Sequence, residues 1–146
     1  MESVKEWDGT PPNKSMLPLP SSDQTRFIYY DSCRGLEAWS VFCLNLDLFF
    51  KEKESCDDAQ KYADEQRELF MTDDEKKKKY AAMWCYMAMT RPINTLFIRL
   101  KYKNDFSENL LSIARKLSFV QVLGDSLSER PSNVVGSIGI DNYLVL

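Results

Sequence analysis

The chain has 146 residues, 44% of them hydrophobic and 28% charged, so it is long enough to bury the core of one ordinary domain. Its formal net charge of −3 excludes the basic composition of proteins that bind nucleic acid through their overall field, so any DNA binding is expected to be local. Histidine is absent and the 4 cysteines form no C-x-x-C pair, which argues against a zinc site or a Cys–His nucleophile. We therefore expect no metal bound by this chain.

The first part of the chain is typical of a linker or domain edge. Residues 1–24 hold 4 of the 6 prolines and only scattered apolar residues. Trp7 is the residue there that we expect to be anchored, and exposure at a domain boundary is the alternative. With no signal-peptide pattern and no apolar run near the ~20 residues that cross a bilayer, a cytoplasmic location without a membrane partner is the default expectation.

A charged loop is predicted between two apolar segments. Arg26–Tyr30 is aromatic and β-branched, and Val41–Leu46 is apolar again, which predicts strand, loop and strand. In the loop, the cation Arg34 and the anion Glu37 lie on either side of Gly35, which can adopt backbone angles closed to other residues. A loop of this kind can direct charge toward a ligand.

Two helices are predicted in the segment that follows. Residues 55–70 carry apolar side chains at helical spacing. Thr72 and Glu75 have the spacing of a capping box, so a second helix is expected to begin there. This helix continues through residues 80–89, which are apolar on nearly every side and therefore typical of a buried helix.

Four consecutive lysines, Lys76–Lys79, lie near the start of the second helix. They point in all directions around the helix axis, and the acidic residues just before them offset their charge. We therefore favour a solvated helix entrance, and contact with DNA is the alternative.

The chemistry changes abruptly at the end of the second helix. Thr90 and Arg91 follow the apolar residues, Pro92 ends the helix, and Thr95–Ile98 is typical of a buried strand. An arginine at the end of a core helix, next to a sheet, is either paired internally or directed into a cleft.

The C-terminal part predicts one more helix. Residues 106–117 form one broad apolar stripe, and Asn104 or Ser107 is the expected cap. Residues 119–123 predict a short strand. Residues 134–146 alternate small apolar residues with glycine, which leaves an edge strand and an unpaired tail as alternatives.

The predicted fold class is α/β, with a single domain over residues 25–123 and a loop and tail over residues 124–146. Strands are expected near residues 26–31, 40–46 and 95–100. Because these segments are apolar runs rather than clean alternations, we expect a mostly parallel sheet with helices on both faces.

Two segments resemble the UvrD/Rep-type superfamily 1 DNA helicases in their second, C-terminal RecA-like motor domain. The segment SCRGLEAWSVFCL resembles helicase motif V, usually T-x-H-S-x-K-G-L-E followed by an apolar strand. The segment YMAMTRPINTLFI resembles motif VI, usually Y-V-A-x-T-R-A followed by an apolar strand. Their order and separation also fit, and the resemblance covers about residues 25–100. It implies a RecA-like topology.

The resemblance implies roles for five residues. Arg91 matches the catalytic arginine that reaches the γ-phosphate of ATP, which is bound with Mg²⁺ mainly by the N-terminal motor domain. Glu37 matches a glutamate near the nucleotide, and Gly35 allows that loop to approach closely. Ser32 and Arg34 match the part of motif V that faces the nucleic-acid backbone and couples it to the ATP site.

The chain also departs from these motifs. Tyr29 stands where the family has threonine, and Asp31 stands where it has histidine, so an anion replaces a neutral or cationic neighbour of phosphate. Arg34 in place of lysine keeps the charge, and Pro92 replaces alanine.

The chain contains no G-x-x-x-x-G-K-[ST] segment, so we expect it not to hydrolyse ATP alone. The resemblance implies the C-terminal motor-domain fragment of an ATP-dependent DNA helicase. Its partners would be the N-terminal motor domain of the same polypeptide and single-stranded DNA. The alternative is a degenerate stand-alone module that binds nucleic acid or protein without hydrolysis, as the departures at Tyr29 and Asp31 suggest.

Overall fold

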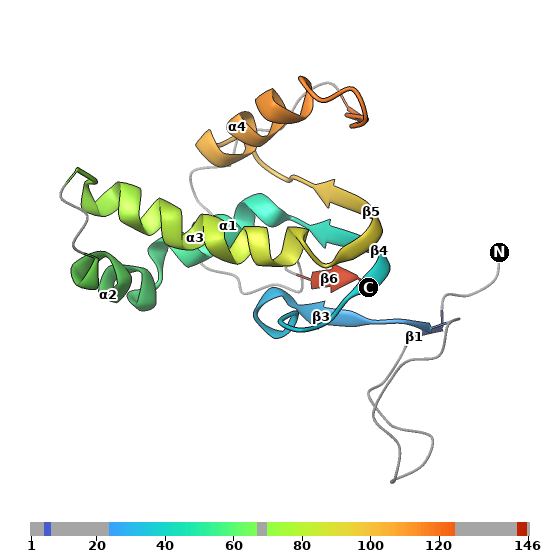
Figure 1. Ribbon diagram of the computed structural model, residues 1–146, viewed down its shortest axis with the longest axis horizontal. Helices are drawn as coiled ribbons and strands as arrows, with labels where there is room; N and C mark the ends of the chain where they lie inside the picture. Colours follow the sequence, from blue (N-terminus) through green and yellow to red (C-terminus); the bar gives the residue numbers. More distant parts are fainter. Residues whose placement is uncertain (1–4, 7–23, 67–69, 125–142, 146) are drawn as a thin grey trace, which may run out of the picture.

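The computed structural model describes residues 5–6, 24–66, 70–124 and 143–145, and in these ranges the protein is mixed α/β (Figure 1). A small sheet pairs strand β1 in parallel with β2. The principal sheet has four strands in the order β3-β6-β4-β5. The strands are β1 (Lys5–Glu6), β2 (Gln24–Thr25), β3 (Phe27–Tyr29), β4 (Ala38–Leu44), β5 (Pro92–Arg99) and β6 (Tyr143–Val145).

Three helices connect β4 to β5, as a parallel pair of strands requires a long crossover. A fourth helix follows β5, and a short 3-10 turn follows β3. These elements are the turn η1 (Tyr30–Ser32) and the helices α1 (Leu46–Ser55), α2 (Asp57–Glu65), α3 (Asp73–Met89) and α4 (Asp105–Ala114).

The predicted parallel arrangement is confirmed for β4 and β5 but not for the whole principal sheet. Strand β6 lies between β3 and β4 and is antiparallel to both. For residues 134–146 we expected either an edge strand or an unpaired tail. Neither describes β6, which is a central strand of the principal sheet. The short strand predicted at residues 119–123 is also wrong, because these residues form a turn and irregular structure.

The register divides the principal sheet into two faces. One row across the strands contains Ile28, Cys43 and Ile98, which join the core formed with helices α1, α3 and α4. The next row contains Phe27, Phe42 and Phe97, and these side chains are 43%, 39% and 47% exposed.

The phenylalanine row shows that the described helices cover one face of the principal sheet, so the expectation of helices on both faces is not met within the described ranges. Phe42 and Phe97 stack with ring centroids 4.4 Å apart. Alternation along β4 and β5 explains the difference, because neighbouring residues of a strand point to opposite faces. Because neighbouring residues in β4 and β5 are both apolar, the sequence predicted burial on both faces of the sheet. Among the described residues, helices bury only one of these faces.

Helix α1, which the sequence analysis did not predict, organises the core. Tyr30 stacks on Phe49 of α1 with centroids 4.4 Å apart, and the Tyr30 hydroxyl donates to the carbonyl of Leu44 at 2.9 Å. Phe50 of α1 stacks on Phe106 of α4 at 4.3 Å. The helix therefore joins the turn after β3 to the helix after β5.

Candidate functional site

The loop of residues 32–37 and the end of α3 meet at the start of β4 and β5. The amide of Ala38 donates to the carbonyl of Arg91 at 3.2 Å, and Ala38 pairs with Pro92 in the sheet. Within the loop, the Leu36 amide donates to the Cys33 carbonyl at 3.1 Å, and Gly35 has φ 77°, a left-handed value that favours glycine. Two segments more than 50 residues apart thus share one hydrogen-bonded junction.

Arg91 is half-buried and bonded to the C-terminal end of α3. Its Nε donates to the carbonyl of Met87 at 2.7 Å, and its Nη2 donates to the Thr90 hydroxyl at 3.1 Å. The Thr90 hydroxyl also donates to the Met87 carbonyl, at 3.1 Å. A cation at this end of a helix interacts favourably with the helix dipole. Among the described residues no carboxylate forms an ion pair with Arg91, so its charge is fixed in place without being neutralised.

The structure gives a partner to Asp31, the residue that stands where the helicase motif has histidine. Its carboxylate pairs with Lys53 of α1, with 2.6 Å between Oδ1 and Nζ. Lys53 also lies over the rings of Trp84 and Phe49, at 4.7 Å and 5.5 Å from their centroids. Burial alone would lower the pKa of Lys53, but the hydrogen bond and charge of Asp31 raise it overall, so the lysine stays protonated beside its partner.

The other predicted site residues lie on exposed parts of the loop. Arg34 reaches back over the Trp84 ring, with its guanidinium carbon 5.7 Å from the centroid. Ser32 ends η1, and Glu37 directly precedes the Ala38 junction. No hydrogen bond among the described residues joins Ser32 or Glu37 to Arg91. The fold therefore brings the motif-like segments together through their main chains rather than through these side chains.

Sequence analysis missed Lys53 and Trp84 as members of this site. Lys53 lies four residues after Phe49, so both occupy the same face of α1. A lysine on the apolar face of a helix is a signal for an acidic partner close by. Trp84 gave no signal beyond its place in an apolar helix.

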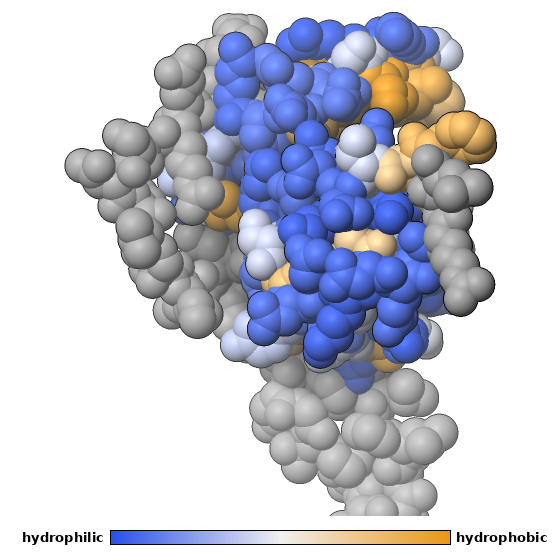
Figure 2. Space-filling view, turned by 90° about the vertical axis from the view of Figure 1, so that its left-hand side faces the viewer, coloured by the Kyte–Doolittle hydropathy of each residue, from blue (hydrophilic) through white to orange (hydrophobic). Residues whose placement is uncertain are grey.

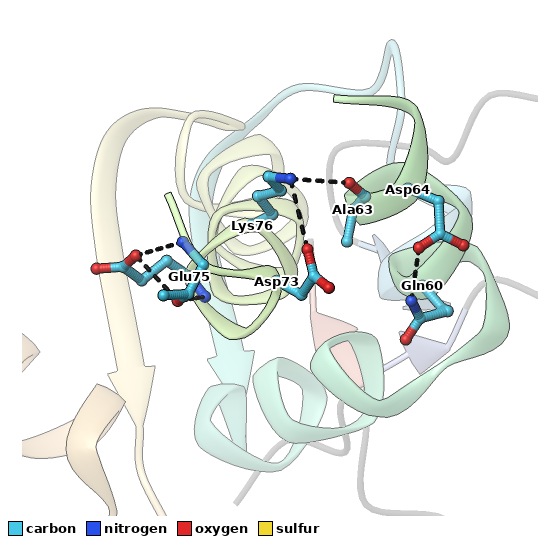
Figure 3. A network of polar contacts seen from close by, with 7 residues as sticks. Gln60, Ala63, Asp64, Asp73, Glu75 and Lys76 are labelled. Atoms are coloured by element: carbon cyan, nitrogen blue, oxygen red, sulfur yellow. Dashed lines mark hydrogen bonds and ion pairs between the residues drawn. The ribbon is translucent and has the colours of Figure 1, made fainter. Parts of the chain in front are cut away.

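The run Lys76–Lys79 is only partly a solvated helix entrance. The Lys76 side chain is 12% exposed and donates to the Ala63 carbonyl at 3.2 Å, while Asp73 lies 3.4 Å from its Nζ (Figure 3). Lys78 is 3.7 Å from Asp105 of α4. The predicted capping box of Thr72 and Glu75 is confirmed just before them. Lys76 therefore links the start of α3 to the end of α2 by a hydrogen bond. The face of the molecule on this side is largely hydrophilic (Figure 2).

Three cysteine thiols lie in the core, and one of them belongs to the loop itself. Cys33, Cys43 and Cys85 are buried and free, which confirms the prediction that Cys43 and Cys85 are reduced core residues. Burial raises the pKa of the Cys43 and Cys85 thiols from the ordinary 9.0 to about 12. These thiols are packing groups and not nucleophiles at neutral pH.

The raised pKa values predict a loss of stability in alkaline solution. Between pH about 9 and 10 the unfolded chain releases protons from thiols that the folded chain retains, so the free energy of unfolding falls as pH rises. The expected slope is up to about 1.4 kcal/mol per pH unit for each thiol. Urea unfolding at pH 7.5, 9 and 10 measures it. Cys85→Ala should make the slope shallower, and an identical slope in that variant would contradict the assignment.

Searches against models of protein families, curated proteins and solved structures found no match for this chain. In the described ranges, no helix is both long and apolar enough to cross a membrane. The described side chains also contain no group of three or more His, Cys, Asp or Glu residues placed to hold a metal ion.

Proposed function

We propose that this protein is the C-terminal RecA-like motor domain of an ATP-dependent superfamily 1 DNA helicase. The domain supplies Arg91 and the loop of residues 32–37 to an ATP site shared with the N-terminal motor domain of the same polypeptide. Single-stranded DNA and ATP with Mg²⁺ are the ligands of the assembled enzyme.

The hydrogen bond between the Ala38 amide and the Arg91 carbonyl carries this proposal. It joins Ala38, within the segment that resembles motif V, to the arginine of the segment that resembles motif VI. A conformational change in the loop is thereby connected to the position of Arg91 through one main-chain contact and the β4–β5 pairing. This is the connection that a motor domain needs between a DNA-facing loop and an ATP-facing arginine.

Arg91 is suited to a phosphoryl group presented by a second domain. The guanidinium is always charged, and its remaining N–H groups are available after the bonds to Met87 and Thr90. An arginine of this kind stabilises the charge that develops on the transferring phosphoryl group. Because the described residues provide no cluster of carboxylates, we assign the binding of Mg²⁺ to the N-terminal motor domain.

The loop is assigned the coupling role. Gly35 allows the backbone to approach the nucleotide beside Glu37, while the exposed Ser32 and Arg34 face the DNA backbone. Closure of the two motor domains on ATP moves this loop relative to the DNA, and reopening after hydrolysis returns it.

ATP hydrolysis by the full-length natural polypeptide, with and without single-stranded DNA, tests the proposal. We expect hydrolysis that DNA stimulates, and none from the 146-residue chain alone because it has no phosphate-binding loop. A full-length polypeptide that binds DNA or protein but never hydrolyses ATP would instead support the degenerate binding module.

A further inference from the structure

Lys53 links the candidate loop to α3, the helix that precedes Arg91. It is held on three sides, by the Asp31 carboxylate at 2.6 Å and by the rings of Trp84 and Phe49. Trp84 belongs to α3 and lies about two helical turns before Arg91. The contacts of one side chain therefore span η1, α1 and α3.

We infer that Lys53 is a positioning residue for the loop of residues 32–37. It neutralises Asp31 at the start of the loop and fixes the loop to the face of α3. The catalytic meaning of this role depends on the proposed function, whereas the positioning itself does not. Lys53 lies outside both of the segments that resemble helicase motifs.

Charge explains why the position requires a cation. Asp31 and Arg34 lie in the same short segment, and Arg34 rests over the same Trp84 ring as Lys53. Without Lys53, the Asp31 carboxylate would lose its ion-pair partner and would attract the Arg34 guanidinium of the same segment. With Lys53 in place, Asp31 is satisfied and Arg34 remains a cation at the surface.

Burial explains why the pair can hold the loop. The Lys53 side chain is only 14% exposed, so water screens its charge less than in an ordinary surface pair, while the Asp31 side chain is 50% exposed. The neighbouring pair of Lys51 and Glu54 lies within α1 itself, and among the described residues no hydrogen bond or ion pair joins it to the loop. Lys51 is therefore a matched control on the same helix.

Amide hydrogen exchange of the 146-residue chain tests the positioning role. In Lys53→Met, which keeps a long apolar side chain but removes the charge, we expect the Leu36 and Ala38 amides to exchange about fivefold faster. The Glu108 amide at the start of α4, which donates to the Asn104 carbonyl at 2.9 Å, should be unchanged. Lys51→Met should leave all three amides unchanged, and Lys53→Arg should restore the slow exchange.

Equal acceleration of all three amides in Lys53→Met would mean a general loss of stability and would overturn the inference, as would no acceleration.

A second measurement separates the positioning role of Lys53 from the proposed function. If the full-length polypeptide is an ATPase, Lys53→Met should lower kcat for DNA-stimulated hydrolysis and leave KM for ATP unchanged, and an unchanged kcat would overturn the catalytic role. If the unaltered polypeptide never hydrolyses ATP, the proposed function fails, while faster exchange at Leu36 and Ala38 still supports positioning.

Discussion

Replacing Arg91 with alanine in the full-length polypeptide is expected to lower kcat for DNA-stimulated ATP hydrolysis by about 10³-fold or more. The guanidinium is the side chain of this domain that we assign to the γ-phosphate, and its charge is not neutralised by any carboxylate in the described residues. Steady-state kinetics at saturating ATP and single-stranded DNA measure the change. Arg91→Lys should recover only part of the rate, because lysine keeps the charge but not the planar fork.

The matched control is Arg115→Ala, which removes an exposed arginine from the C-terminal end of α4 and should leave kcat unchanged. Because Arg91 also bonds to the end of α3, the unfolding of Arg91→Ala must be compared with that of the unaltered protein. A well-folded Arg91→Ala protein with unchanged kcat would show that this arginine does not act on the nucleotide.

Replacing Asp47 with alanine is expected to reduce the free energy of unfolding by about 2–4 kcal/mol. Asp47 is fully buried in the first turn of α1, and its two carboxylate oxygens accept from the amides of Lys101 and Tyr102, each at 2.9 Å. Alanine removes the acceptor of both half-buried amides and releases the chain after β5 from α1. Urea unfolding of the 146-residue chain measures the loss.

Two further variants make the Asp47 experiment specific. Asp47→Asn keeps one oxygen acceptor and should lose a smaller part of the stability. Asp64→Ala removes an exposed carboxylate that accepts from Gln60 on α2, and it should change stability by less than about 0.5 kcal/mol. If Asp47→Ala unfolds at the same urea concentration as Asp64→Ala, the buried carboxylate does not hold these segments together.

The features that the sequence predicted are those that neighbouring residues determine. Thr72 and Glu75 form the expected capping box because both partners lie within one turn. Asn104 caps α4 in the same way, with Ser107 as its partner three residues later. Helix α3 ends at Met89, shortly before Pro92, which begins β5, as expected for a residue without an amide hydrogen.

The features that the sequence did not predict depend on partners far apart in the chain. The place of β6 between β3 and β4 depends on pairings across more than 90 residues, and no local pattern in residues 134–146 specifies them. The pair of Asp31 and Lys53 likewise requires α1 to lie against η1. Sequence analysis therefore predicted a charged loop and an arginine after a core helix, but it did not predict the side chains that hold the loop.

The phenylalanine row marks a different limit of sequence analysis. Phe42 and Phe97 are as apolar as their neighbours Cys43 and Ile98, so composition alone cannot tell the exposed face from the core face. The register decides it, because each row across the strands is assigned to a single face.

A structure of the full-length polypeptide with ADP and aluminium fluoride, which imitates the transferring phosphoryl group, tests the central claim most directly. The account predicts that the Arg91 guanidinium lies about 3 Å from the fluoride atoms, with the loop of residues 32–37 beside the nucleotide. A nucleotide bound elsewhere, with Arg91 still bonded only to Met87 and Thr90, would contradict it.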